Sequence, residues 1–363
     1  MKKSLSIVLA VALVLMLALS ACGAEPAPAA PAAPAAPAAP AAPAEPEAPA
    51  EPAEEPAPAV EEKVFNLNLS SPVGDTHPAI TALNETAEAL KEASNGTINI
   101  TVYANGALGD QPDGIAGLKL GTMDIQHCNA GPLATVIPEI DVFNLPYIFE
   151  SGDHEVKAMN GEIGAWVKEL VEGAGFHYLG WIYGGSRSII TDVGPVNSPA
   201  DLNGLKIRVQ SSDTMVAMIN AMGGIGTPMT QSEVYSALQQ GVIDGWENSV
   251  ITLQSLSLYE VSQYFSRTEH LINPDFLLMS ESIWEQMSEN QQKLVTEAFE
   301  KFVAREYELW MAQEADVEAQ LVSEGVTFND VDKAPFAEAC QVLWETYKGN
   351  FGEDVINLIQ GCK

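Results

Sequence analysis

Positive charge is scarce in this sequence of 363 residues. It has 17 lysines and arginines against 49 aspartates and glutamates, which gives a formal net charge of −32. Only four of those cations are arginines. So acidic a chain repels phosphate backbones and anionic lipids, which argues against nucleic acid and anionic membrane surfaces as partners. An anionic ligand would have to be held by local cations rather than by the field of the whole protein.

Cysteine is rare as well, with four residues in the chain. Cys22 belongs to the N-terminal leader, which leaves an odd number and at most one internal pair. Cys340 lies in a predicted C-terminal helix and Cys362 in the tail after it, so a disulfide between them is possible. Cys128 would then be a free thiol buried in an apolar strand.

Motifs of hydrolytic and metal-dependent enzymes are missing. The sequence has no Gly-x-Ser-x-Gly motif, and its five histidines stand singly, without the spacing of a zinc site. Gly184-Gly185-Ser186 is not followed by the Lys-Ser/Thr of a phosphate-binding loop. The sequence therefore predicts no catalytic residue, no metal and no cofactor.

No apolar run is as long as a membrane-spanning helix, which needs roughly 20 residues. The longest apolar run is residues 5–19. It follows Lys2 and Lys3 and ends at Leu19-Ser20-Ala21-Cys22, a pattern typical of a lipoprotein signal peptide at residues 1–22. Cys22 would then be lipidated as the first mature residue. The alternative is an uncleaved N-terminal anchor.

Residues 23–62 are almost entirely alanine, proline and glutamate. Such a composition cannot form a core and favours extended, polyproline-like chain, so we predict a disordered tether. At ~3.1 Å per residue it would reach up to about 120 Å from the membrane. Without the leader lysines and the eight glutamates of the tether, the folded body has a net charge of about −26.

The most informative stretch is residues 198–250, whose pattern is β-α-β-α-β. Its apolar segments predict strands at 205–209 and from 242, and helices at 212–222 and from 232. Polar residues gather at the ends of these strands, where α/β folds place their ligands.

Arg208 stands inside the apolar strand 205–209. In so acidic a protein an arginine there is not needed for solubility, and its guanidinium suits the bidentate binding of a carboxylate. The alternative is that Arg208 closes an internal salt bridge, as partly buried arginines often do.

The same stretch carries a family resemblance. The sequences LNGLKIRVQ and TPMTQSEVYSALQQGVIDGWEN resemble the signature of the solute-binding proteins of TRAP transporters, the tripartite ATP-independent periplasmic carriers. The similarity runs from about Val64 to the C-terminus and includes LGTMD at 120–124, GPL at 131–133 and FNLPYIF at 143–149. It implies a C4-dicarboxylate-binding type of protein that is not an enzyme and delivers a small organic acid to the TRAP permease subunits.

The resemblance and the pattern of elements imply an α/β fold of the periplasmic-binding-protein type II-like class, with two α/β lobes around a cleft. We place the first crossover between lobes at Gly184-Gly185. The expected ranges are 63–184 plus about 272–311 for lobe I, and 185–271 plus about 312–363 for lobe II.

Helices outside the central stretch follow from apolar periodicity and capping signals. We predict helices at 78–93, 154–172 and 332–348. A capping box at Ser288 begins an unusually long helix, 289–323, which is long enough to span both lobes.

The resemblance also implies roles for individual residues. Arg208 takes the place of the arginine that grips the ligand carboxylate, and Arg187 that of a second cation. Asn248 takes the place of an asparagine that bonds to the same carboxylate. Ser70 and Asn129 occupy the usual polar positions of the first lobe.

Two departures from the family pattern bear on the ligand. Gln231 replaces a common phenylalanine, and Trp246 replaces a common glutamine or threonine. Trp246 would be a stacking wall of the pocket or, alternatively, a packing residue at the hinge; Trp181 and Tyr183 are further candidates for a pocket wall. Some relatives hold a metal through a Glu-Trp pair, but the order here is Trp246-Glu247, so no metal is expected.

The residues leave the ligand open among C4-dicarboxylates, sugar acids, and aromatic or keto acids. A lipoprotein sensor that feeds a signalling kinase, and an exported enzyme on the same fold, are the alternatives to transport. We expect an exported protein, lipid-anchored to the membrane and facing the periplasm or the cell exterior.

Overall fold

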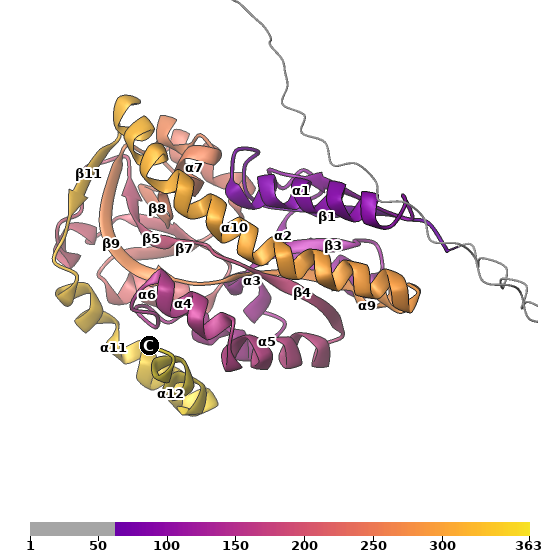
Figure 1. The fold of residues 1–363 in the computed structure, drawn as a ribbon. Helices are drawn as coiled ribbons and strands as arrows, with labels where there is room; N and C mark the ends of the chain where they lie inside the picture. Colours follow the sequence, from indigo (N-terminus) through magenta and orange to yellow (C-terminus); the bar gives the residue numbers. More distant parts are fainter. Residues whose placement is uncertain (1–61) are drawn as a thin grey trace, which may run out of the picture. The chain divides into compact units, whose positions relative to one another are not determined.

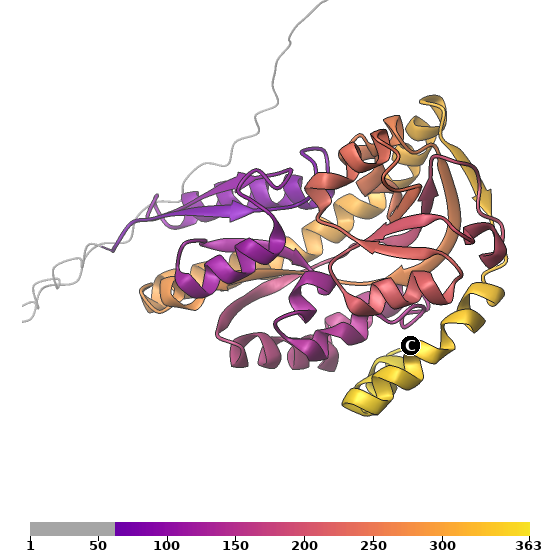
Figure 2. The same cartoon turned by 180° about the vertical axis from the view of Figure 1, so that it is seen from behind.

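The computed structural model of the protein describes residues 62–363. The predicted signal peptide, the lipidation of Cys22 and nearly all of the predicted tether lie outside the described residues. Two mixed β-sheets, each flanked by helices, form the described part (Figure 1, Figure 2). None of the helices in this part is both long and apolar enough to span a membrane.

The first sheet has five strands in the order β2-β1-β3-β10-β4. β1 runs parallel to β2 and β3, whereas β10 runs antiparallel to β3 and β4. The strands span Phe65–Ser70 (β1), Ile98–Tyr103 (β2), Ile125–Asn129 (β3), Phe176–Ile182 (β4) and Asp275–Ser280 (β10).

The second sheet has six strands in the order β11-β9-β5-β8-β6-β7. β6 is parallel to β7 and β8, and β5 is antiparallel to β8 and β9. The predicted strand from residue 242 begins later, at Gly245, so the polar residues expected at its end form the strand itself. The strands span Ser186–Thr191 (β5), Lys206–Val209 (β6), Ile225–Pro228 (β7), Gly245–Asn248 (β8), Tyr264–Ile272 (β9) and Thr327–Asp330 (β11).

Helices cover both sheets. Those of the first sheet are α1 (Pro78–Ala93), α2 (Gln111–Leu120), α3 (Ala130–Ala134), α4 (Gly152–Met159), α5 (Glu162–Gly173) and α9 (Glu281–Trp284). The second sheet carries α6 (Asp213–Ala221), α7 (Val234–Gln239) and α8 (Val250–Ser255). The C-terminal helices are α10 (Glu289–Ser323), α11 (Ala334–Phe351) and α12 (Asp354–Gly361), and short 3-10 turns lie at Pro138–Asn144, Pro199–Leu202, Gln231–Glu233 and Leu258–Glu260.

The chain crosses between the sheets at Gly184-Gly185, where β4 of the first sheet leads into β5 of the second. Gly185 has a φ of +70°, and a Cβ there would lie 2.1 Å from the ring of Trp310 on α10. Glycine is required because both the backbone conformation and the tryptophan ring exclude a side chain. The chain returns between β9 and β10.

α10 has the bounds predicted for the long helix. Its capping box is formed by Ser288 and Gln291. The 35 residues extend over roughly 50 Å. α10 packs against α1 and β4 on the side of the first sheet and against α8 on the side of the second, so it joins the two lobes (Figure 1).

The single helix predicted at 154–172 is wrong, because α4 ends at Met159 and α5 begins at Glu162. The break falls at Asn160-Gly161. A Cβ on Gly164 would lie 1.9 Å from the carbonyl oxygen of Met159, so α5 approaches the end of α4 more closely than a side chain would permit. The apolar periodicity continues through Asn160-Gly161, so the periodicity gave no sign of the break.

The C-terminal tail also differs from expectation. It forms a further helix, α12, which packs against α5 of the first lobe rather than staying with the second. His154 Nε2 lies 2.8 Å from the carbonyl oxygen of Ile359 and helps to fix α12 there. Cys340 and Cys362 are both free thiols, so the possible disulfide is not formed; the Cys362 thiol donates to the carbonyl oxygen of Leu358 instead.

Two glutamates are fully buried without a cation, Glu155 on α4 and Glu306 on α10. Both carboxyl oxygens of Glu155 and Oε1 of Glu306 lack a hydrogen-bond partner, while Glu306 Oε2 accepts a bond from the backbone N–H of Tyr183 at 3.2 Å. Burial raises the pKa of both carboxyl groups well above their usual range, and nearby Asp275 raises each pKa further. We therefore expect both groups to be protonated at neutral pH.

Gly185→Ala should lower the free energy of unfolding by roughly 2–5 kcal/mol, because it combines a left-handed backbone with a clash against Trp310. Urea unfolding would measure the loss. Gly204→Ala is the matched control, since Gly204 has a φ of +81° and open space around it, and it should lose only about 1–2 kcal/mol. Equal losses in the two variants would contradict the assigned role of the Trp310 contact.

Glu155→Gln should stabilise the protein increasingly as pH rises above about 5. The folded-state pKa of Glu155 is raised, so the stability of the wild type is highest below the unfolded pKa and is lost as pH rises through the folded pKa. The stability difference should grow by up to about 1.4 kcal/mol per pH unit. Denaturant unfolding at several pH values checks it, with the same substitution at exposed Glu338 as control, and a difference independent of pH would contradict the prediction.

Candidate functional site

A cavity of about 60 Å³, partly open to solvent, lies between the lobes. This volume is well below the roughly 300–1,000 Å³ of small-molecule pockets, so a ligand as large as a sugar acid requires the lobes to move apart. Asp110 and Gln126 line it from the first lobe, and Arg208, Gln210 and Gln231 line it from the second. Gln210 directly follows the carboxyl end of β6, where α/β folds place their ligands, whereas Gln126 lies near the start of β3.

Arg208 extends from β6 into this cavity and is 2% exposed. Its Nε and Nη2 atoms donate to the carbonyl oxygen of Met229 at 2.9 and 2.8 Å, and Nη1 donates to Gln231 Oε1 at 3.2 Å. Within residues 62–363 no carboxylate forms an ion pair with it, so the structure does not contain the internal salt bridge that the sequence left open. Burial lowers the pKa of Arg208 to about 10, which still leaves it charged at neutral pH.

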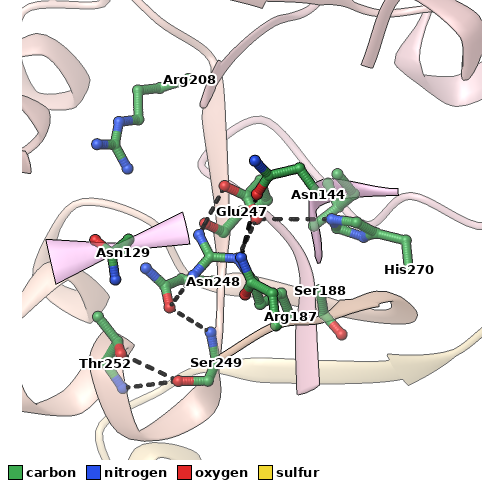
Figure 3. A network of polar contacts seen from close by, with 12 residues as sticks. Asn129, Asn144, Arg187, Ser188, Arg208, Glu247, Asn248, Ser249, Thr252 and His270 are labelled. Atoms are coloured by element: carbon green, nitrogen blue, oxygen red, sulfur yellow. Dashed lines mark hydrogen bonds and ion pairs between the residues drawn. The ribbon is translucent and has the colours of Figure 1, made fainter. Parts of the chain in front are cut away.

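Arg187, on β5, is held by a buried ion pair with Glu247 (Figure 3). Nε donates to Glu247 Oε2 at 2.6 Å, and Nη2 donates to Oε1 at 2.8 Å. Burial is the largest influence on the pKa of Glu247 and raises it, but the charge and hydrogen bonds of Arg187 and His270 together outweigh burial and keep that pKa below its usual range. Arg187 thus has no unbalanced charge, in contrast to the free second cation that the resemblance implies.

Asn248 lies beside this ion pair and is oriented by it. Its Oδ1 accepts hydrogen bonds from Arg187 Nη1 at 3.2 Å and from the backbone N–H of Ser249 at 2.8 Å. Because only the amide oxygen accepts, these two bonds fix which way the amide points. The Nδ2 group, which has no acceptor in the described part of the chain, remains available as a donor. Figure 3 shows Asn248 between Arg187 and Asn129, with Arg208 standing apart from the ion pair.

The polar side chains expected to bind ligand from the first lobe either bond to other residues of the protein or are buried away from the cavity. Asn129 accepts a hydrogen bond from Gln111 Nε2 at 2.7 Å and donates from Nδ2 to Asp275. The Ser70 hydroxyl is buried at the end of β1, has no partner, and does not line the cavity.

The aromatic residues proposed as pocket walls do not line the cavity. Trp246 is fully buried within the core of the second lobe, where its Nε1 donates to Ser262 Oγ at 2.9 Å, so it is a packing residue rather than a stacking wall. Trp181 donates to Asn160, and the Tyr183 ring packs edge-on against Trp310. Gln231 is the one departure from the family pattern that does lie beside Arg208.

Sequence reasoning missed several polar residues that line the cavity, among them Asp110, Gln126 and Gln210. Gln210 directly follows strand β6, and Gln126 lies on β3, so their positions at strands of the two lobes were the available signal. Asp110 precedes α2, and no pattern in the sequence indicates that its side chain faces Arg208.

A serine–histidine–aspartate chain lies in the first lobe but does not form an accessible site. Ser71 Oγ is 2.8 Å from His127 Nδ1, and His127 Nε2 is 3.1 Å from Asp275 Oδ2. Ser71 and His127 have no exposed surface, and neither lines the cavity, so no substrate can reach the hydroxyl. Within residues 62–363 no group of three or more His, Cys, Asp or Glu side chains is arranged to hold a metal ion.

The sequence matches the family described as bacterial extracellular solute-binding protein, family 7 (DctP), over residues 69–350. The chain belongs to this family. It is therefore a solute-binding protein rather than an enzyme, and the resemblance seen in the sequence is confirmed.

Relatives extend over most of the chain. A solute-binding protein of Chromohalobacter salexigens is 36% identical over 273 residues, which are 75% of this chain and 81% of the relative. The sialic acid-binding periplasmic protein SiaP of Vibrio cholerae is 31% identical over 272 residues, 75% of this chain and 84% of the relative.

Solved structures confirm the two-lobed α/β fold. A TRAP periplasmic solute-binding protein of Pseudomonas putida F1 with bound D-glucuronate has a TM-score of 0.79 and 35% identity, and the match covers 82% of this chain and 97% of that one. A TRAP protein from a Sulfitobacter species with bound β-D-galacturonate has a TM-score of 0.79 and 34% identity, covering 82% and 100%. Both ligands are uronates, so these neighbours give no support to the C4-dicarboxylate type.

Removing one partner of the Arg187–Glu247 pair should cost about 3–5 kcal/mol of stability, because it leaves an uncompensated charge in the core. Arg187→Met and Glu247→Gln each create that situation. The double variant should lose clearly less than the sum of the single losses, since it leaves no charge behind. Denaturant unfolding of the three variants measures the coupling, and additive losses would contradict the assigned pairing.

Proposed function

We propose that this solute-binding protein captures a small organic acid of the uronate class in the cavity between its lobes. The carboxylate of the ligand binds Arg208, and the observation that carries the proposal is the state of this side chain. It is charged, almost fully buried, and anchored through neutral acceptors without a carboxylate partner. A buried charge of this kind gains most from an anion that completes its hydrogen bonds.

Asn248 and Arg187 assist Arg208 in this proposal. The Asn248 Nδ2 group donates to the same carboxylate, because its oxygen is held by Arg187 and the backbone of Ser249. Arg187 acts mainly through that orientation, since Glu247 balances its charge. Gln231 positions Arg208 from the opposite side.

The polar lining of the cavity supports a sugar acid rather than an aromatic acid. Gln126, Gln210 and Gln231 offer amides that exchange hydrogen bonds with hydroxyl groups, and no aromatic side chain lines this space. Structural neighbours that bind D-glucuronate and β-D-galacturonate support the same class.

We also propose that the ligand-bound protein delivers the acid to the membrane subunits of a TRAP permease. The family supports this partner. The leader pattern ending at Cys22 supports a lipid anchor, with residues 23–62 as the tether that holds the binding body away from the membrane. For delivery to be limited to the ligand-bound protein, the bound ligand must favour the closed form of the lobes over the open form by a few kcal/mol.

Arg208→Ala should weaken binding of D-glucuronate or D-galacturonate by about 2–5 kcal/mol, because it removes the only cation that faces the ligand. Isothermal titration calorimetry measures the change, after thermal-shift screening has shown which uronate binds. Arg305→Ala is the control, since Arg305 lies on the surface of α10 and pairs with Glu85. Unchanged affinity in Arg208→Ala would overturn the assigned site.

A further inference from the structure

The charges that line the cavity are few and of opposite sign. Among residues 62–363, Arg208 and Asp110 are the only charged residues of its lining, and the rest are amides, hydroxyls, glycines, prolines and two apolar side chains. One ligand carboxylate is therefore balanced by Arg208. A second carboxylate finds no unpaired cation, because Arg187 is neutralised by Glu247.

Asp110 is placed where its charge acts on the cavity rather than on its own helix. It is the N-cap residue of α2, a position where aspartate normally accepts a bond from the first turn, yet its side chain makes no such bond. Its Oδ1 instead accepts a hydrogen bond from Ser232 Oγ of the second lobe at 2.9 Å. Burial lowers the pKa of Arg208, and Asp110 is one of the acids that partly offset this, which places the two charges in one electrostatic environment.

We propose that Asp110 makes this cavity selective for acids with one carboxylate and several hydroxyl groups, and excludes dicarboxylates of the same size. The inference rests on the proposed function and deepens it. A hydroxyl group near Asp110 donates a charge-assisted hydrogen bond to its carboxylate. A second carboxylate in the same place meets a like charge, and the repulsion between the two lowers its affinity.

The size of the effect decides whether it is measurable. Two like charges about 5 Å apart at a protein surface repel strongly enough to lower affinity by tenfold or more, even with substantial solvent screening. The loss of one charge-assisted hydrogen bond to a hydroxyl group lowers the affinity for the acid that carries this hydroxyl by roughly tenfold. Removal of the Asp110 charge therefore changes the ratio of the two affinities, and not only their level.

The experiment compares D-glucuronate with D-glucarate, which has the same hydroxyl-bearing carbons and a second carboxylate. Dissociation constants are measured by calorimetry for the wild type and for Asp110→Asn, after circular dichroism has verified folding. We expect the wild type to prefer glucuronate by about tenfold or more. In Asp110→Asn the ratio of the two affinities should change by tenfold or more, and by up to about a hundredfold where about tenfold tighter glucarate binding combines with about tenfold weaker glucuronate binding.

Two control variants separate charge from other effects. Asp113→Asn removes the same charge from the same helix, but Asp113 is exposed and does not line the cavity, so both affinities should stay as in the wild type. Ser232→Ala removes the hydrogen bond across the lobes and keeps the Asp110 charge. It should weaken both ligands by the same factor and leave their ratio unchanged.

Each remaining outcome counts against the inference. If wild-type protein binds glucarate as tightly as glucuronate, or if Asp110→Asn weakens both ligands equally as Ser232→Ala does, Asp110 has no selective role. The proposed function survives both results as long as binding depends on Arg208. If the wild type binds neither ligand nor any other acid, the proposed function itself fails, and the inference fails with it.

Discussion

The site depends on a guanidinium that is buried and charged but fixed by neutral acceptors. The β6–β7 pairing makes this possible, because Arg208 lies beside Thr227 in register and the chain then brings the Met229 carbonyl oxygen to its Nε and Nη2 atoms. A carbonyl dipole orients the side chain without cancelling its charge. The cation is therefore held in place and still has the capacity to bind an anion.

The contrast with Arg187 shows how environment divides the work between two residues of the same type. Both are buried and both come from strands of the second sheet, yet only Arg187 has a carboxylate partner. Because Glu247 balances the charge of Arg187, this arginine orients Asn248 and does not add a second positive charge to the site. The cavity thus receives one full positive charge, from Arg208, while the oriented amide of Asn248 lies outside its lining.

Much of the fold followed from local signals in the sequence. The bounds of α1 were predicted from its apolar periodicity, and those of α10 from its periodicity and its capping box. The crossover at Gly184-Gly185 was predicted from the glycine pair, and there the chain passes from the first sheet to the second. Arg208 was found because an arginine inside an apolar strand is unusual. The break between α4 and α5 was missed because it depends on a close approach of two backbones that periodicity does not record.

Contacts between distant segments account for the errors at the site. Trp246 packs against Ser262, Arg187 is neutralised by Glu247, and Asp110 reaches Ser232 across the lobes. Each of these depends on which strands are neighbours, and strand order was not readable from the sequence. The pairing partner of a charged residue decides its role, and residue type and position alone did not reveal that partner.

The two uncharged glutamic acids in the core tie folding to the acid–base chemistry of the solvent. Burial raises the pKa of Glu155 and of Glu306 well above the usual range, so each carboxyl group holds a proton more tightly in the native protein than in the unfolded chain. Unfolding therefore releases protons, which the buffer binds. The heat absorbed on melting in a calorimeter will include the buffer's own protonation enthalpy, and will differ between phosphate and Tris even where the melting temperature does not.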